Sequence, residues 1–390
     1  DTLCKDGLMA VGECPNGYAL QDPVLNFSDL ISGPSTGLGD GKGSGVIVTV
    51  WGQNLGSSQN ASTIQYCDSL SVCRDGHVYY WKNADGTLPG GPANLYESHG
   101  MQEIAFSIPD SALGNGRIKV VVNGVDARTV SGGDLAFTVR AGNIYHVATS
   151  GSNANDCSYA NPCAYINANI DSGAAGTTNG VGNARMSAGD VVYSHGVLEP
   201  SFTGGGVNVG MYLRGLNGTE ASPVSIAAYP DGSNFSRIVA DHRGVNRYLT
   251  EGIVLSKYRI SVGHVDPALP PDAGNTVLSN LHTQATKNGR VIGSHMIQND
   301  NTCFTGWAGA ITSANEDGDN FKAFGNHIDS LGCANSSRYQ HTLYMSIRDE
   351  SATVTRPWEV AYNYLDSNDV FYGIHFYDES YSGDCGTMTG

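Results

Sequence analysis

The sequence is poor in charged residues, poorer still in basic ones, and has no long apolar run. Charged residues make up 15% of the 390 residues, and 21 Lys and Arg face 37 Asp and Glu, which gives a net charge of −16. Nucleic acids and anionic membranes bind clustered Lys and Arg, so we expect neither as a partner. An acidic substrate would need a local basic patch or a bridging cation. No apolar run approaches the roughly 20 residues of a membrane span.

Short catalytic motifs are also missing. The sequence has no HExxH, GxSxG, Walker or GxGxxG motif, which argues against a metalloprotease, a serine hydrolase or a nucleotide enzyme. The alternating glycines at 39, 41, 43 and 45 are not followed by Gly-Lys-Ser/Thr, so they do not form a phosphate loop. We therefore expect no organic cofactor.

What the chain does contain favours turn-rich β structure. It has 51 Gly and 20 Tyr, and its hydrophobic residues amount to 40%, enough for substantial cores. These proportions predict a globular all-β protein with a surface covered largely by small polar residues.

Nine cysteines indicate an oxidising compartment. None lies in a CxxC pair, and each close pair brackets a short polar segment, which predicts stapled loops and a secreted or cell-surface protein. The chain begins at Asp1 without a signal peptide, as a processed mature protein would. Cys385 is left over and is expected to pair farther downstream or in another subunit. The predicted disulfides are Cys4–Cys14, Cys67–Cys73, Cys157–Cys163 and Cys303–Cys333.

Three segments follow from the turn pattern. Residues 1–22 form a Cys-bounded N-terminal segment, residues 23–140 have the texture of a β-sandwich, and residues 141–390 differ from both. Asn123-Gly124 is a hairpin signal. The strands expected in the second segment are Val46–Trp51, Val78–Trp81, Glu103–Ile108, Arg117–Val122 and Ala136–Val139.

The second segment resembles a known family of immunoglobulin-like domains. The run Gly45-Val-Ile-Val-Thr-Val-Trp-Gly-Gln-Asn-Leu-Gly56, preceded by the loop Ser32-Gly-Pro-Ser-Thr-Gly37, is similar to the strand and turn of IPT/TIG domains. That resemblance implies an immunoglobulin-like β-sandwich that acts as a spacer or a carbohydrate-associated module.

The third segment resembles right-handed parallel β-helix proteins. Ile144-Tyr-His-Val-Ala-Thr-Ser-Gly-Ser-Asn-Ala-Asn-Asp156 and Asn161-Pro-Cys-Ala-Tyr-Ile166 are similar to the first strand of that family, and Ala188–Tyr193 and Ala221–Pro230 fit the rungs that follow. The expected fold class is therefore all-β, an Ig-like β-sandwich followed by a right-handed parallel β-helix.

Internal repetition supports this expectation without reference to any family. Four similar seven-residue segments carry a His or Tyr at their fifth position, and this position recurs at steps of 31, 32 and 37 residues. A coil of three short strands needs somewhat over twenty residues, so each step leaves room for loops, where sites are often built. The recurring residues are His264, His295, His327 and Tyr364.

Alternation within each repeat assigns faces. Ile328 and Leu365 are expected to point inward, while His327 and Tyr364, followed two residues later by Asp329 and Asp366, point outward. Asp266 should lie two coils from Asp329, in the same column.

Two interpretations of these columns stay open. One is a stacking ladder that serves only packing. The other is a polysaccharide groove in which His327 and Tyr364 bind sugar while Asp329 and Asp366 act as acid and base or hold Ca²⁺.

A second group of candidate catalytic residues follows a predicted stapled loop. The segment Ser337-Arg-Tyr-Gln-His-Thr-Leu-Tyr-Met-Ser346 resembles one found in β-helix proteins that also carry an IPT/TIG-like domain. His341 could abstract a proton in a lyase, or could equally be a structural residue at a coil corner. The residues grouped with it are Arg338, Tyr344, His375 and the substrate-binding candidate Asp378.

Three functions are compatible with these features. The first is an extracellular protein that binds a polysaccharide or cell-surface glycan, with lyase or glycosidase activity left open. The second is a structural adhesin, stalk or filament subunit, self-associating through β-helix ends or Cys385. The third, a phage tailspike, is disfavoured because such spikes assemble in a reducing cytoplasm.

Overall fold

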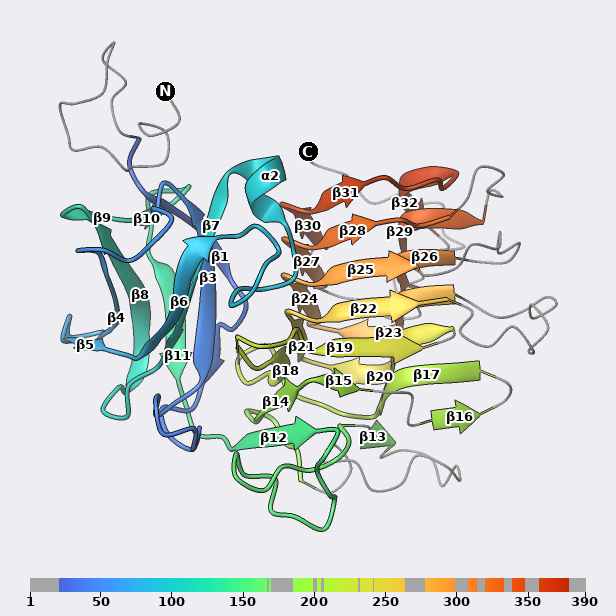
Figure 1. The fold of residues 1–390 in the computed structure, drawn as a ribbon, viewed down its shortest axis with the longest axis horizontal. Coiled ribbons are helices and arrows are strands. Elements are labelled where there is room, and N and C mark those ends of the chain that lie inside the picture. Colours follow the sequence, from blue (N-terminus) through green and yellow to red (C-terminus); the bar gives the residue numbers. More distant parts are fainter. Residues whose placement is uncertain are drawn as a thin grey trace.

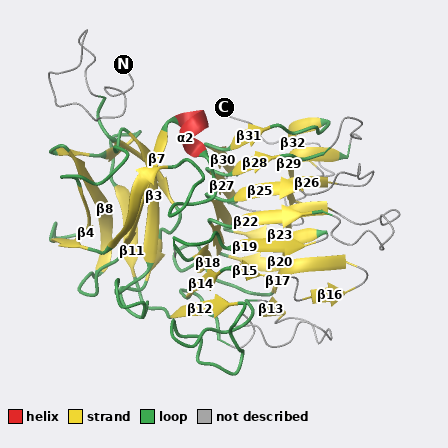
Figure 2. Cartoon of the chain, in the orientation of Figure 1, coloured by secondary structure: helices red, strands yellow, loops and turns green. Residues whose placement is uncertain are grey.

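The computed structural model is built almost entirely of strands (Figure 2). It describes residues 21–166, 168–169, 185–198, 202–204, 207–230, 232–240, 242–263, 278–298, 308–313, 320–332, 339–347 and 358–378. Within these residues the single helix is α2 (Leu95–His99), capped by Asn94 and Gly100. No helix of the described residues has the length and hydropathy needed to cross a membrane.

Two sheets form the N-terminal part, which we call the two-sheet region. Their strands pair in mainly antiparallel fashion, with short parallel pairs at one edge of each sheet. The first sheet has the order β10 (Arg128–Thr129), β1 (Val24–Ser28), β3 (Ile47–Gln53), β7 (Met101–Ser107) and β6 (Val78–Asn83). The second has the order β2 (Ser32–Gly33), β11 (Leu135–Val139), β8 (Gly114–Val122), β4 (Thr63–Asp68) and β5 (Cys73–Asp75), with β9 (Val125–Asp126) paired to β8.

Apolar side chains from both sheets meet in one core. Val48 and Phe106 of the first sheet belong to the same buried cluster as Tyr66 and Phe137 of the second. All five strands expected from the sequence of this region are present with shifts of a few residues at their ends. The hairpin expected at Asn123-Gly124 joins β8 to β9, and both turn residues have positive φ.

From Ile144 onward the chain winds through three parallel sheets in turn; we call this part the coil (Figure 1). The contact sheet, which faces the two-sheet region, contains β12 (Ile144–Ala148), β14 (Val191–His195), β18 (Val224–Ala228), β21 (Ile253–Ser256), β24 (Arg290–Ile292), β27 (Lys322–Phe324) and β30 (Glu359–Ala361). The front sheet contains β15 (Val197–Leu198), β19 (Arg237–Ala240), β22 (Arg259–Val262), β25 (His295–Gln298), β28 (His327–Asp329) and β31 (Tyr364–Asp366).

The third sheet closes each turn of the coil. It contains β13 (Ala168–Asn169), β17 (Val207–Arg214), β20 (Arg243–Glu251), β23 (Leu278–Lys287), β26 (Ala308–Ser313), β29 (Gln340–Ile347) and β32 (Tyr372–Asp378), with β16 (Phe202–Gly204) paired to β17. Alternate residues of all three sheets point inward and stack on the same position of the next turn, which builds one continuous apolar core. Ile328 is fully buried in that core and Leu365 packs against it, as the sequence predicted.

The register corrects one step of the repeat derived from sequence. His295 pairs with Arg259 of the preceding turn, so Arg259 takes the position that the sequence alignment assigned to His264. Ser261 likewise takes the place expected for Asp266. The alignment was wrong because it matched the apolar run of β22 to that of β24, which belongs to a different sheet. His264 and Asp266 themselves lie outside the described residues.

The coil and the two-sheet region share a buried junction. Tyr193 and Val254 of the contact sheet belong to the apolar cluster that fills the two-sheet region. The contact is closest where the chain turns from the contact sheet to the front sheet, with residues 257, 293, 325 and 362 all at positive φ. A Cβ added at Gly325 would lie 2.4 Å from Phe27 and one at Gly293 would lie 2.7 Å from Trp51, so both turns require glycine.

Two of the expected disulfides lie within the described residues, Cys67–Cys73 and Cys157–Cys163. The second closes a loop that hydrogen-bonds to β12, the first strand of the contact sheet, through His146 and Ala148. The other predicted cysteines, Cys4, Cys14, Cys303, Cys333 and Cys385, lie outside the described residues.

Candidate functional site

One outward-facing row of polar and aromatic side chains runs along the front sheet. Each member is the first residue of its strand, and consecutive members pair in register. Because strands of one sheet lie about 4.8 Å apart, the row repeats with that spacing along the coil. We call it the front-sheet row; its members are Arg237, Arg259, His295, His327 and Tyr364.

The rings of the row are stacked face to face. The ring centroids of His295 and His327 are 4.6 Å apart with planes at 9°, and those of His327 and Tyr364 are 4.8 Å apart at 14°. Each ring therefore covers its neighbour and presents mainly its edge to solvent. His327 is 9% exposed. Burial and the neighbouring His295 hold the pKa of His327 below its usual value.

A pair of carboxylates lies two residues beyond the stacked rings. Asp329 and Asp366 are register partners on β28 and β31, as the sequence predicted, and Ile297 occupies the turn before them. Asp329 Oδ2 lies 2.9 Å from His295 Nε2 and 3.6 Å from His327 Nε2. Burial tends to raise the pKa of Asp329, but the hydrogen bond and charge of His295 outweigh it and lower the pKa. Among the described residues, His295, His327 and Asp329 form a group that could hold a metal ion.

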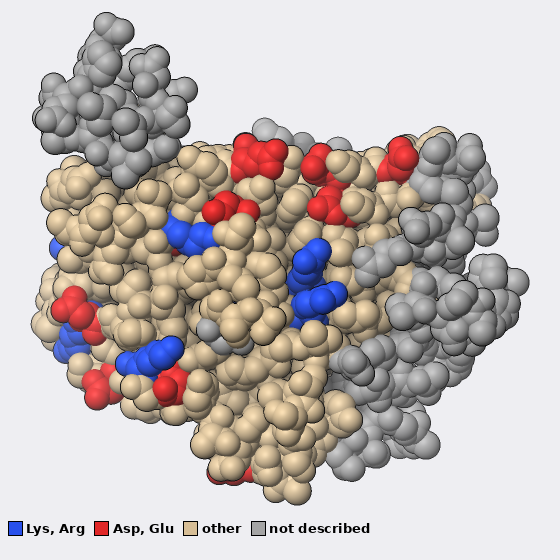
Figure 3. Space-filling model, in the orientation of Figure 1, with Lys and Arg blue, Asp and Glu red and all other residues tan. Residues whose placement is uncertain are grey.

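The other end of the row is cationic. Arg237 and Arg259 form no ion pair among the described residues, and the Nε atom of each has no hydrogen-bond partner. Figure 3 shows Lys and Arg side chains gathered on the exposed face of the coil, with Asp and Glu nearer its top. The row thus supplies the local basic patch that the overall negative charge made necessary for an acidic ligand.

Part of the second predicted group is assembled on the third sheet, where His341 and Tyr344 are buried and His375 is partly exposed. His341 Nε2 lies 3.0 Å from His375 Nδ1, and the ring of His341 contacts Tyr344 and stacks on Tyr372. His341 is 1% exposed and Tyr344 is 4% exposed. Burial and the neighbouring His375 lower the pKa of His341 to about 4, so this imidazole is neutral near pH 7. Burial of both side chains matches the structural interpretation of His341 better than the catalytic one.

Two further predicted residues cannot be added to this group. Arg338 lies outside the described residues. Asp378 is placed in β32, in register with Ile347; the description of this strand end covers the backbone and not the side chain.

Sequence reasoning missed a polar network at the junction. The carboxylate of Asp40 accepts hydrogen bonds from the hydroxyls of Tyr79 and Tyr229, the latter at 2.7 Å. The rings of Tyr229 and His195 are 4.5 Å apart, and His195 Nε2 lies 3.0 Å from His146 Nδ1. These residues come from distant parts of the chain and belong to no local motif, so the sequence offered no signal for them.

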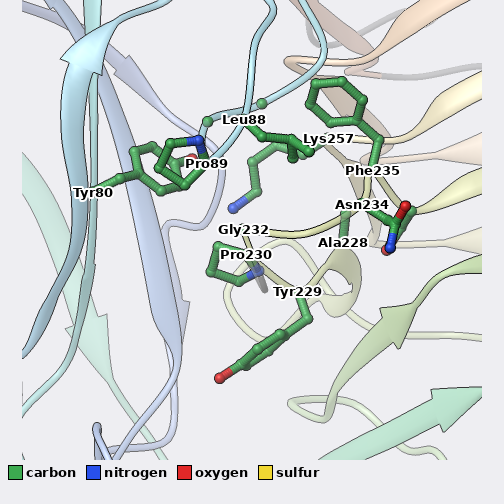
Figure 4. Close-up of a pocket in the computed structure, with 13 residues that line it drawn as sticks. Tyr80, Leu88, Pro89, Ala228, Tyr229, Pro230, Gly232, Asn234, Phe235 and Lys257 are labelled. Carbon is green, nitrogen blue, oxygen red and sulfur yellow. The ribbon is translucent and has the colours of Figure 1, made fainter.

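A small hollow lies beside this network (Figure 4). It is open to solvent, and its walls include Pro89 from the two-sheet region and Pro230 from the coil. The ammonium of Lys257 points into the space between them, where it donates to Thr49 Oγ1 at 2.7 Å and lies 3.6 Å from Asp29 Oδ2. Because this ammonium is already engaged, the hollow is a gap in the junction rather than the leading ligand site.

No protein-family model matches the chain, and no curated protein or solved structure matches it. Functional inference therefore rests on the residues described above.

Proposed function

We propose that this chain is an exported protein in which an immunoglobulin-like domain of the IPT/TIG type precedes a right-handed parallel β-helix, and that it binds an acidic polysaccharide along the front sheet. Parallel strands joined through intervening strands follow a right-handed path in nearly all proteins, which supports the handedness. The two disulfides support export, because such bonds persist mainly in oxidising compartments.

The observation that carries the proposal is the front-sheet row. It places one polar or aromatic side chain on each of five consecutive turns of the coil, at a constant spacing, and so offers repeated contacts to a linear polymer. Arg237 and Arg259 have guanidinium donors without an acidic partner among the described residues, and guanidinium groups bind carboxylates in a bidentate manner. A uronate-containing polysaccharide is the class of ligand that suits this end of the row.

Catalysis by this row is a separate question. Asp329 and Asp366 are neighbours on adjacent turns, and paired carboxylates at such spacing serve as acid and base in glycosidases. Asp329 is already paired with His295, however, so we propose that the row binds a polysaccharide and do not extend the proposal to catalysis. Release of unsaturated products or reducing ends from a bound polysaccharide would add an enzymatic step to it.

The test measures binding of the whole chain to polygalacturonate and alginate, with neutral dextran as the control polymer. We expect binding to the acidic polymers only, weakening as salt is raised. Replacing both Arg237 and Arg259 by Ala should weaken it at least about tenfold, because hydrogen bonds to charged groups are worth about 1.5–3 kcal/mol each. Arg117→Ala, in the two-sheet region, is the matched control. Failure to bind any acidic polymer, or equal binding by the double variant, contradicts the proposal.

A second function is favoured by the last turn of the coil that the structure describes. Ile374 and Phe376 continue the inward columns of Leu343 and Met345, yet they are 46% and 47% exposed, and Phe371 is 55% exposed. At the opposite end, by contrast, the disulfide loop covers β12. An exposed apolar end with strand edges can pair with another chain, as a filament or stalk subunit would.

Self-association is tested by sedimentation at increasing protein concentration, together with negative-stain microscopy. The structural function predicts concentration-dependent oligomers or filaments, which the variant Phe376→Asp should abolish. A protein that stays monomeric at high concentration contradicts this second function and leaves the first intact.

A further inference from the structure

Three side chains with metal-ligating atoms lie close together on the front sheet. One ligand atom from each of His295, His327 and Asp329 lies within 4.8 Å of the other two, on the outer face where two adjacent turns of the coil pair. Zinc lies about 2.0–2.2 Å from imidazole nitrogen and carboxylate oxygen, so ligand atoms around a tetrahedral ion are roughly 3.4 Å apart. The separations from Asp329 Oδ2, 2.9 Å to His295 and 3.6 Å to His327, lie on either side of that value.

One of the three groups has a polar atom without a hydrogen-bond partner in the part of the chain that the structure describes. That atom, His327 Nε2, is buried, and the residue as a whole is 9% exposed. A buried polar atom without a partner is costly, and native proteins rarely keep one unless another group satisfies it. Asp329 lies too far from this nitrogen for a hydrogen bond, but within the range that a shared ion would bridge.

The donor set indicates which ion fits. Two imidazoles with one carboxylate suit zinc and its first-row neighbours, whereas Ca²⁺ and Mg²⁺ require mainly oxygen ligands. Asp366, the register partner of Asp329, adds a second carboxylate nearby. The two imidazole rings are parallel in this structure, so binding of one ion by both requires at least one ring to rotate about its Cβ–Cγ bond until its nitrogen points at the ion.

We propose that His295, His327 and Asp329 form a binding site for one divalent transition-metal ion of the zinc class, on the outer face of the coil. Three protein ligands leave at least one coordination position for water or an oxygen atom of a ligand. The site uses neither Arg237 nor Arg259, so it stands independently of polysaccharide binding, and either proposal can fail alone. The sequence left Ca²⁺ open as one option for these carboxylates, whereas the donor set of this site favours an ion that prefers nitrogen.

The test titrates ZnCl₂ and, separately, CaCl₂ into the chelator-treated whole chain by calorimetry, and measures bound metal after dialysis. We expect one zinc ion per chain and no comparable binding of Ca²⁺. His327→Gln and Asp329→Asn should each weaken zinc binding at least about 100-fold, since even outer-shell changes cost about 10–100-fold. Co²⁺ should give a visible absorption band in the wild type that both variants lose.

The matched control is His195→Gln, which removes one histidine of a similarly close pair that lies elsewhere in the coil. It should bind zinc as the wild type does, and circular dichroism checks that every variant is folded. The proposal is overturned if the wild type binds no zinc, or if folded His327→Gln and Asp329→Asn both retain wild-type affinity. Loss of zinc binding in the control alone would place the ion at the junction and would overturn it as well.

Discussion

The contact sheet and the front sheet are two outer faces of the same coil, yet they carry different side chains. Outward residues of the contact sheet, such as Tyr193, Val254 and Ile292, are buried against the two-sheet region. The first residue of each front-sheet strand from β19 to β31 is charged, polar or aromatic, and all of these except the buried His327 are partly exposed. Both faces have the same backbone and the same strand spacing, so the difference reflects what each face meets.

The two faces also differ in how their polar groups are paired within the chain. On the contact face, the buried side chains of Lys257 and Asp29 pair with each other. On the front face, Arg237 Nε, Arg259 Nε and His327 Nε2 have no hydrogen-bond partner among the described residues. We therefore expect substitutions at the junction to change mainly folding, and substitutions in the front-sheet row to change mainly binding.

The largest effect is expected at Glu103, buried at the junction beside Gly91. Burial raises the pKa of Glu103 to about 8, against an ordinary value near 4.5. A carboxyl that binds its proton more tightly when folded contributes stability below pH 4.5, and that contribution is lost as the pH rises to about 8. At about 1.4 kcal/mol per pKa unit, the loss is up to about 5 kcal/mol.

Glu103→Gln should remove this pH dependence, because the amide stays neutral and can still accept the hydrogen bond from Gly91. Urea unfolding between pH 4.5 and 8.5 measures it, with the exposed Asp110→Asn as the control. A wild-type stability that does not fall relative to Glu103→Gln over this range would show that Glu103 is ionised in the folded protein.

The next effect concerns the buried pair of the junction. Asp29 accepts hydrogen bonds from the backbone of Leu30 and Thr49 and from Ser256, and faces Lys257. Asp29→Asn leaves the Lys257 ammonium buried without its counter-charge, which typically costs about 3–5 kcal/mol of unfolding free energy. Denaturant unfolding measures the loss.

Two further variants sharpen this result. Adding Lys257→Met to Asp29→Asn should recover part of the loss, because no unpaired charge then remains. Arg128→Ala, which removes one side of an exposed ion pair with Asp126, should cost no more than about 1 kcal/mol. If Asp29→Asn cost as little unfolding free energy as Arg128→Ala, the buried pair of the junction would contribute no more to stability than an exposed ion pair.

The smallest effect is expected in the front-sheet row. Stacked ring pairs contribute about 0.5–1.5 kcal/mol beyond their burial, so the coupling energy between His327 and Tyr364 should fall in that range. A double-mutant cycle with His327→Ala and Tyr364→Ala measures the coupling by urea unfolding. Coupling of several kcal/mol would mean that the row is a structural ladder, as one interpretation of the sequence held, and would weaken its assignment to binding.

Several features of the molecule could be predicted from the sequence because they depend on local patterns. The strands of the two-sheet region follow alternation and turn signals, and the Asn123-Gly124 hairpin follows from the backbone preferences of its two residues. The pairing of Asp329 with Asp366, and the inward position of Ile328, follow from a period of two within each strand. These inferences needed no knowledge of distant contacts.

Other features could not be predicted from the sequence because they depend on which residues pair between turns, and the turns differ in length. The step from Arg237 to Arg259 is 22 residues, whereas that from Arg259 to His295 is 36, so no single period aligns them. His264 was matched to His295 by residue type, and the cationic end of the row was missed. The burial of His341 was equally out of reach, because exposure is set by neighbours that a single strand does not specify.

By itself, the sequence determined an all-β chain with disulfide-stapled loops and short strands that repeat along its length, since alternation, glycine turns and cysteine spacing act over a few residues. Only the tertiary structure decided which outward residues became a buried junction and which became the front-sheet row. The physical reason is that a strand specifies the two sides of its sheet but not what covers them. Packing of the two-sheet region against the contact sheet left His295, His327 and Asp329 together on the open face.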